Sequence, residues 1–424
     1  MIRELLNRYS HINWAFADQG LVSGVNFLTG LLIARVLGLE SFGVYTLLWM
    51  VVLFVNSIQM AVISAPMMSI GPKQAADFKT KYYQAVFWHQ LIFSVMSVCI
   101  SVLALLLASY YFPEWQISKI LIPLTLVLFF NQNQDFLRRL FFSTNKSKKA
   151  FLCDVVSYGG QVSLVVGLYF LGGIDLALVL WAVALTSAAA VVLGVSTIGV
   201  PKINGDDLNK VWARHWVYSK WAVLTALLQW VSGNLVFILC GALLGVSAVG
   251  AVKAAQNIMA VFHIVFQGME NFVPAKASQI LHHMGVVPMR RYVYRVLAVG
   301  CVGISLFSLA VFGMAEELMH LLYGDDYSGY GYILQWFSVV YILMYLAVPL
   351  RFGLRALEET RGIFLAQFFS ALVVIIIGEV LIDTQGLTGV MCLLFVSYLT
   401  ALSILFTKFN VELQKNVQRV GCVK

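Results

Sequence analysis

The stretch ARVLGLESFGVY (Ala34–Tyr45) is followed 207 residues later by GALLGVSAVGAV (Gly241–Val252). Each copy places a glycine, four residues and a second glycine between two long apolar runs: Gly38 and Gly43 in the first, Gly245 and Gly250 in the second. Two flanking matches keep nearly the same offset: Val22, Ser23 and Gly24 with Val231, Ser232 and Gly233, and Gln59 and Pro66 with Gln267 and Pro274. The chain is therefore predicted to consist of two similar halves.

The composition indicates that these halves lie in a membrane. Hydrophobic residues make up 60% of the 424 positions and charged residues 11%, against about 25% charged in soluble domains. Uncharged runs such as residues 176–200 and 221–252 exceed the roughly 20 apolar residues that a membrane-crossing helix needs. The predicted fold class is an all-α polytopic membrane protein.

Apolar runs between polar breaks predict twelve spans, and six per half make the two repeats parallel, with an axis along the membrane normal. We expect residues 1–210 and 211–424 to form two six-helix lobes around a central cleft. The expected spans are 14–37, 42–65, 85–110, 117–136, 151–172, 175–199, 217–243, 249–273, 293–314, 329–350, 362–382 and 386–407.

The basic residues predict the orientation. Of the 28 Lys and Arg residues, all but Arg35, Lys119 and Lys253 fall on one side of the twelve-span arrangement. Cytoplasmic loops carry the excess of Lys and Arg, so both termini are expected in the cytoplasm. The net charge of +8 then reflects orientation and attraction to anionic membrane lipids, and no nucleic-acid partner is implied.

The first corner also resembles a known family. Residues 17–59, and within them Ala34, Arg35, Leu37, Gly38, Phe42, Gly43 and Tyr45, are similar to the opening of bacterial polysaccharide-biosynthesis membrane proteins. These are lipid-linked oligosaccharide flippases of the multidrug/oligosaccharidyl-lipid/polysaccharide exporter superfamily. The resemblance implies an inner-membrane secondary transporter that moves a polyprenyl-diphosphate-linked glycan from the cytoplasmic to the periplasmic leaflet. It also implies polysaccharide-assembly enzymes as partners, and no cofactor.

The eighth span holds a polar series with helical spacing. Intervals of 3, 4, 3, 4 and 3 place on one helix face Lys253, Gln256, Ala260, His263, Gln267 and Glu270. A polar stripe inside a span favours a wall that lines a watery cleft, so the Lys, His and two Gln residues are candidate substrate ligands. Alternatively, Lys253 and Glu270 extend to opposite membrane surfaces while the Gln residues bond neighbouring helices.

Candidate ligands also occur in the first two spans. Gln19, Ser23, Asn26 and Gly30 are separated by 4, 3 and 4, and Asn56 and Gln59 follow in the second span. Asn26, Asn56 and Gln59 are expected to flank the cleft, although small residues on one face also mark plain helix packing.

Charged residues suggest two further roles. Arg35 and Lys253 could contact a diphosphate, while Arg35 alternatively pairs with Glu40. Asp18 and Glu270 are candidate ion-coupling groups because a carboxylate in a low-dielectric cleft can load and release a proton; ordinary hydrated carboxylates are the alternative. The NQNQD run (residues 131–135) is predicted to cap the fourth span at the membrane surface.

Two rival functions remain open. A multidrug or cation antiporter of the same superfamily would favour acidic over cationic cavity residues. A membrane glycan polymerase or ligase would need a long periplasmic loop with catalytic residues, whereas the longest outer loop, residues 315–329, is short and acidic. No phosphate-binding loop or metal-binding motif occurs, so no catalytic or metal site is expected.

Overall fold

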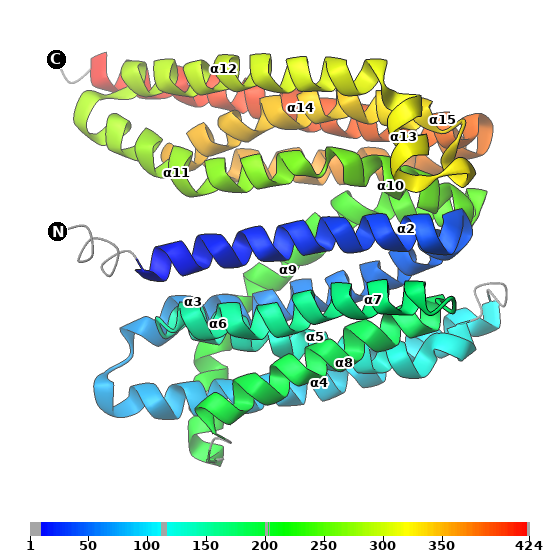
Figure 1. Ribbon diagram of the computed structural model, residues 1–424. Helices are drawn as coiled ribbons and strands as arrows, with labels where there is room; N and C mark the ends of the chain where they lie inside the picture. The colour runs from blue at the N-terminus through cyan, green and yellow to red at the C-terminus, as the bar shows by residue number, and fades with distance from the viewer. Residues whose placement is uncertain (1–9, 112–116, 200–201, 203, 422–424) are drawn as a thin grey trace. The chain divides into compact units, whose positions relative to one another are not determined.

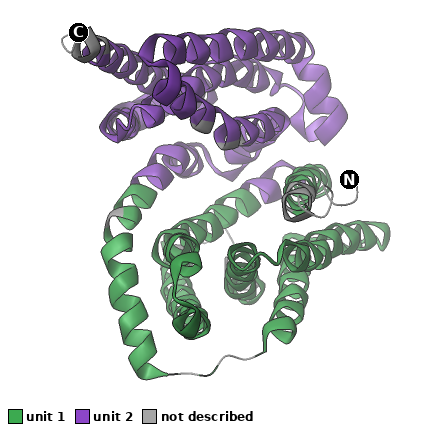
Figure 2. Ribbon diagram, turned by 90° about the vertical axis from the view of Figure 1, so that its left-hand side faces the viewer, with its two compact units in different colours: residues 1–37, 44–227 green, residues 38–43, 228–424 purple. Residues whose placement is uncertain are grey.

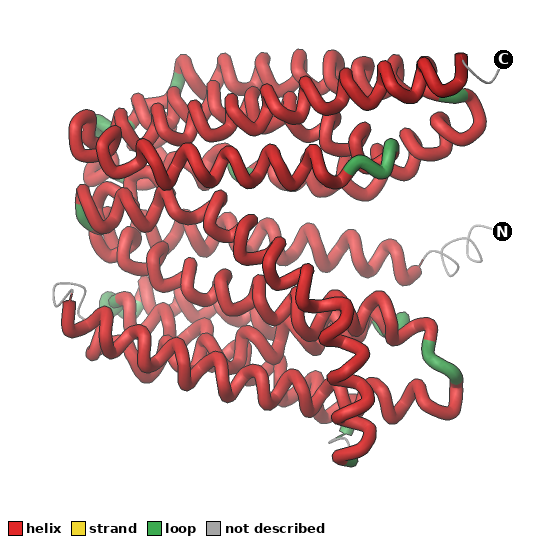
Figure 3. The backbone as a smooth tube through the Cα atoms, turned by 180° about the vertical axis from the view of Figure 1, so that it is seen from behind, coloured by secondary structure: helices red, strands yellow, loops and turns green. Residues whose placement is uncertain are grey.

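The computed structural model of the protein describes residues 10–111, 117–199, 202 and 204–421. Nearly all of these residues are helical and none lies in a strand (Figure 3). A membrane interior offers no water to the backbone, and helices meet this need because their N–H and C=O groups form hydrogen bonds with one another. The first half of the chain forms α2 (Ser10–Gln59), η1 (Met60–Ser64), α3 (Ala65–Ile70), η2 (Gly71–Lys73), α4 (Ala76–Tyr111), α5 (Ile117–Ser143), α6 (Ser147–Asp154), η4 (Val155–Gly159), α7 (Gly160–Phe170) and α8 (Leu176–Ile198) (Figure 1).

The second half of the chain is also made of helices joined by short connections. It forms α9 (Gly205–Leu244), α10 (Val246–Met259), α11 (Val261–Met284), α12 (Val286–Gly313), α13 (Ala315–Tyr323), η5 (Asp325–Tyr327), α14 (Gly331–Ala356) and α15 (Thr360–Gly421).

The helices confirm the twelve-helix fold. Among the described residues, eight helical stretches are long and apolar enough to cross a membrane, and α10 with α11 forms a ninth as a bent pair. Two of the eight, Asp18–Lys73 and Thr360–Asn416, are 56 and 57 residues long, more than twice what a hydrocarbon core of about 30 Å requires. Each is interrupted by a glycine with non-helical backbone, Gly38 or Gly386. Counting each as two helices and adding α5 gives the twelve.

The chain divides into two compact units (Figure 2). Unit 1 comprises Met1–Leu37 and Val44–Leu227, and unit 2 comprises Gly38–Gly43 and Leu228–Lys424. The sequence-based boundary at residues 210 and 211 remains a prediction about the repeat. The structural boundary between the units, at Leu227 and Leu228, lies further along the chain than residue 210. The reason is that the first part of α9 packs on unit 1, where Val211, His215 and Ser219 are buried at intervals of four residues.

Both glycine corners adopt the same backbone conformation. Gly38 has φ 75° and ψ −180°, and Gly245 has φ 89° and ψ 171°, a region that only glycine occupies at little cost. The corner formed by Gly38–Gly43 belongs to unit 2, so both corners lie in the same unit.

The two corners also pack on each other. A Cβ atom on Gly43 would lie 1.8 Å from the carbonyl oxygen of Val246, and one on Gly250 would lie 2.2 Å from that of Leu39. Leu39 and Val246 hold equivalent places in the repeat, so the contact is reciprocal. The short corner recurs because each copy must admit the backbone of the other.

Two π-helical turns interrupt the spans of unit 1 next to buried polar residues. η1 follows Gln59, and η4 follows Asp154 and contains Ser157. All three polar residues are at most 1% exposed. Such π-turns occur often at functional sites, and here they mark the helices that carry the polar interior of unit 1.

Candidate functional site

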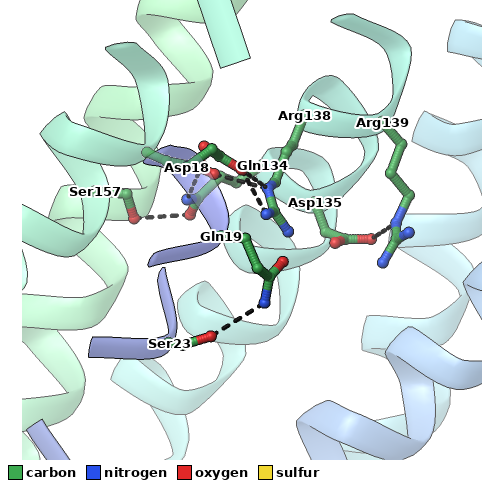
Figure 4. A network of polar contacts seen from close by, with 9 residues as sticks. Asp18, Gln19, Ser23, Gln134, Asp135, Arg138, Arg139 and Ser157 are labelled. Atoms are coloured by element: carbon green, nitrogen blue, oxygen red, sulfur yellow. Dashed lines mark hydrogen bonds and ion pairs between the residues drawn. The ribbon is translucent and has the colours of Figure 1, made fainter. Parts of the chain in front are cut away.

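A buried ion cluster joins α2, α5 and α6 in unit 1 (Figure 4). Arg138 of α5 donates from Nε and Nη2 to Oδ2 of Asp18, at 3.0 and 2.5 Å. The same Nε lies 2.8 Å from Oδ2 of Asp154. Both carboxylate side chains are 0% exposed, whereas Arg138 is 17% exposed. One guanidinium therefore holds two buried carboxylates.

Neighbouring polar groups position the cluster. Gln134, one turn before Arg138, donates to Oδ1 of Asp154 at 3.2 Å and accepts from the Ser157 hydroxyl at 2.8 Å. Oδ1 of Asp18 is buried without a hydrogen-bond partner among the described residues. Two ionised carboxylates and one cation leave a net negative charge, and a buried unpaired charge is costly. The cluster is therefore suited to take up one proton or another monovalent cation.

A polar cavity of about 430 Å³ lies in unit 2. Helices α9, α11, α14 and α15 line it, and its charged lining residues are Arg351 and Glu270. Glu270 accepts a hydrogen bond of 2.7 Å from Arg355, so its charge is already paired. The positive charge of Arg351 is therefore not cancelled by Glu270 within the lining.

Uncharged polar groups make up much of the remaining wall. Ser232 donates to Oε1 of Gln367 at 3.0 Å, and the hydroxyls of Ser370 and Ser397 are 2.6 Å apart. Nε2 of His263 lies 3.0 Å from the hydroxyl of Tyr341. The wall further includes Gln229 and Tyr398. Amides, hydroxyls, an aromatic ring and a guanidinium can together bind sugar hydroxyls and phosphate oxygens.

The predicted eighth-span stripe needs correction. The span is not one straight helix, because it breaks at Ala260 and the two parts are bent by 49°. Lys253 and Gln256 lie on α10, where Nζ of the lysine donates to Oε1 of the glutamine at 2.8 Å. His263 and Glu270 lie on α11 and line the cavity. The side chain of Gln267 falls outside the described part of the structure.

The candidates of the first two spans occupy different surroundings within unit 1. Asn56 donates to Oδ1 of Asn131 at 3.1 Å, and Gln59, fully buried, donates to the Gln132 carbonyl at 2.9 Å. Both thus bind α2 to α5. Asn26 and Arg35 are exposed.

The prediction that the NQNQD run (residues 131–135) caps the end of the fourth span was wrong. Helix α5 continues past this run to Ser143, and the side chains of Gln132 and Gln134 are buried.

Sequence reasoning missed Arg138, Asp154, Arg351 and Gln367. Both arginines were counted only as orientation signals at span ends. Asp154 offered a usable signal, since a carboxylate near the start of an apolar span marks a functional candidate. Nothing in the spacing of the chain brings Arg351 or Gln367 toward His263, because that neighbourhood arises from the packing of three separate helices.

The comparisons with known proteins agree with this fold. A family model described as polysaccharide biosynthesis protein matches residues 32–331. An inward-facing multidrug resistance MATE transporter of the MOP superfamily has a TM-score of 0.77 at 13% identity, covering 94% of this chain and 96% of that one. The lipid II flippase MurJ in an inward closed conformation has a TM-score of 0.70 at 12% identity, covering 96% and 89%.

A third solved structure is a MOP superfamily transporter from Pyrococcus furiosus, with a TM-score of 0.63 at 12% identity, covering 94% of this chain and 93% of that one. No match was found among curated proteins. These solved structures show that the chain has the twelve-helix, multi-pass fold of the transporters to which it is similar. Because the family model covers more than half of the chain, the protein belongs to the polysaccharide biosynthesis protein family.

Proposed function

We propose that the protein is a flippase that moves a polyprenyl-diphosphate-linked oligosaccharide, or a related polysaccharide precursor, between membrane leaflets. The observation that carries the proposal is the cavity of unit 2, in which Arg351 lies among amide and hydroxyl groups as well as apolar side chains. An arginine can hold a phosphate in bidentate fashion, and the uncharged groups suit a sugar. A cation antiporter would be better served by unpaired carboxylates, whereas Glu270 is paired with Arg355.

Further side chains are proposed to contact the substrate along its path. In unit 2 these are Lys253 and Gln256 of α10, with His263 and Gln267 of α11. In unit 1 they are Arg35, Asn26 and Asn56 of α2, whereas the expected ligand Gln59 is buried and holds α2 to α5 instead. Lys253 lies over the ring of Phe237 at 5.5 Å and offers a second cation for an anionic group.

The ion cluster of unit 1 is proposed to couple transport to a cation gradient. Loading one proton on the carboxylates of Asp18 and Asp154 would cancel their excess negative charge over Arg138. That change would alter how tightly α2 is held to α5 and α6, because the ion pairs join these helices. Glu270, whose carboxylate lines the substrate cavity, is the proposed coupling group of unit 2.

The orientation and partners follow from the same proposal. Both termini would face the cytoplasm of a bacterium, the protein would lie in the inner membrane, and the glycan would cross to the periplasmic leaflet by alternating access of the two lobes. Polysaccharide-assembly enzymes would supply and consume the lipid-linked glycan.

Substitution of Arg351 tests the substrate site. In a strain that lacks the chromosomal copy, Arg351→Ala should abolish surface polysaccharide and cause lipid-linked precursor to accumulate, at unchanged protein levels. Arg351→Lys should retain part of the export, since charge persists without bidentate geometry. Arg361→Ala is the matched control, because Arg361 is an exposed residue of α15 outside the cavity lining. Full export by Arg351→Ala would refute the proposed site.

A further inference from the structure

An apolar groove of about 620 Å³ lies in unit 1, apart from the ion cluster. It is formed by α2 with η1, by α4 and by the start of α9. On α4 the exposed apolar side chains of Ile92, Met96 and Ile100 repeat every four residues along it, at 49%, 58% and 66% exposure. The groove is thus open to the side along a membrane-crossing helix.

The length of the groove indicates what it can hold. Its lining residues on α4 run from His89 to Ala104, which corresponds to about 22 Å along the helix axis. One leaflet accounts for about 15 Å, half of a hydrocarbon core of about 30 Å. The acyl chain of a phospholipid, which belongs to one leaflet, would fill only part of the groove. A longer polyprenyl chain would fill all of it.

The first part of α9, residues 205–221, closes one end of the groove. In Figure 1 this part runs crosswise to α4 and α5. Tyr82 and His215 fix it, with 2.7 Å between the tyrosine hydroxyl and Nε2, and Ser219 donates to the carbonyl of Val62 at 3.3 Å. The end of the groove is therefore built and held in place by buried polar contacts.

The groove side of this segment changes from apolar to cationic. Intervals of 3, 4 and 4 place on one side of α9 the residues Asn209, Trp212, Trp216 and Lys220. Asn209 and Trp212 line the groove, and the two tryptophan rings are stacked with centroids 6.1 Å apart. Exposed Trp beside Lys is typical of a membrane–water interface. A lipid phosphate can meet Lys220 there.

We propose that this groove binds the polyprenyl chain of the lipid-linked substrate, with Lys220 near its phosphates. The inference rests on the proposed function for the identity of the lipid. It adds a chain-binding site in unit 1 that is separate from the glycan site in unit 2. The chain remains in the groove, within the hydrocarbon layer, while the polar headgroup is transported.

Photo-crosslinking of the purified full-length protein tests this site. The probe is a polyprenyl diphosphate without glycan that carries a diazirine in its chain. Cross-links should map to the α4 peptide that contains Ile92, Met96 and Ile100. Met96→Trp should reduce their yield severalfold by filling the groove. Val95→Trp should leave the yield unchanged, because Val95 is 50% exposed beside Met96 but lines no part of the groove.

The headgroup end has its own matched pair. Lys220→Gln should weaken binding of the same probe, whereas Arg214→Gln, which changes an exposed cation on the other side of α9, should not. Equal competition by phosphatidylglycerol, or cross-links distributed over all exposed helices, would overturn the inference and identify an ordinary lipid contact. Glycan flipping without groove cross-links would refute the chain site alone. Groove cross-links in a protein that moves no glycan would refute the proposed function alone.

Discussion

Arg138 is paired with two carboxylates, Asp18 and Asp154, that are both fully buried. A buried ion pair gives little net stability compared with an apolar core, but breaking one leaves an uncompensated charge. The arrangement therefore costs stability that an apolar core would not cost. A functional role would explain why the chain has it, which supports the proposed coupling role. Its geometry also predicts how the protein responds to removal of each member.

Arg138→Met should lower the stability of the purified protein by about 3–5 kcal/mol, the cost typical of a broken buried pair. Adding Asp18→Asn and Asp154→Asn to this variant should restore much of the loss, since no buried carboxylate then lacks a cation. Thermal unfolding in detergent at neutral pH provides the measurement. An unchanged midpoint for Arg138→Met would show that the two carboxylates are not held as described.

At the scale of elements, the glycine corners show what a sequence can reveal. The repeat located both breaks, because a positive φ combined with an extended ψ, as at Gly38 and Gly245, is accessible at little cost only to glycine. The eighth span was mispredicted at Ala260, since an alanine, a strong helix former, within a regularly spaced polar series gives no local signal of a bend. Of the polar residues that line the cavity of unit 2, the sequence singled out His263 and Glu270, because they share a helical spacing. It did not single out Arg351 or Gln367, which come close to them only through tertiary packing.

Alanine at either corner should disrupt the reciprocal contact. Gly43→Ala and Gly250→Ala each place a methyl group against a carbonyl oxygen of the other corner, and overpacking of this kind costs about 1–3 kcal/mol or more. Both variants should unfold at lower temperature than Gly303→Ala, whose added Cβ has nothing within 4 Å. Equal midpoints for the three variants would argue against close packing of the corners.

At the scale of the whole molecule, length, composition and the repeat were enough to predict a twelve-helix transporter fold. Orientation rests on the distribution of basic residues alone and requires its own test. In a cysteine-free background, single cysteines at Lys148 and Gly205 should be shielded from a membrane-impermeant maleimide in intact cells. Cysteines at Gly173 and Ser328 should react. The reverse pattern would place the termini outside the cytoplasm.

The most direct measurement of the central claim is translocation by the purified protein in liposomes. The substrate is a polyprenyl-diphosphate-linked oligosaccharide with a fluorescent sugar, and an impermeant quencher reports which leaflet holds it. Wild-type protein should move the glycan between leaflets, Arg351→Ala should not, and Arg361→Ala should match the wild type. Failure to move the glycolipid by protein that transports a fluorescent organic cation would contradict the account and favour a multidrug antiporter.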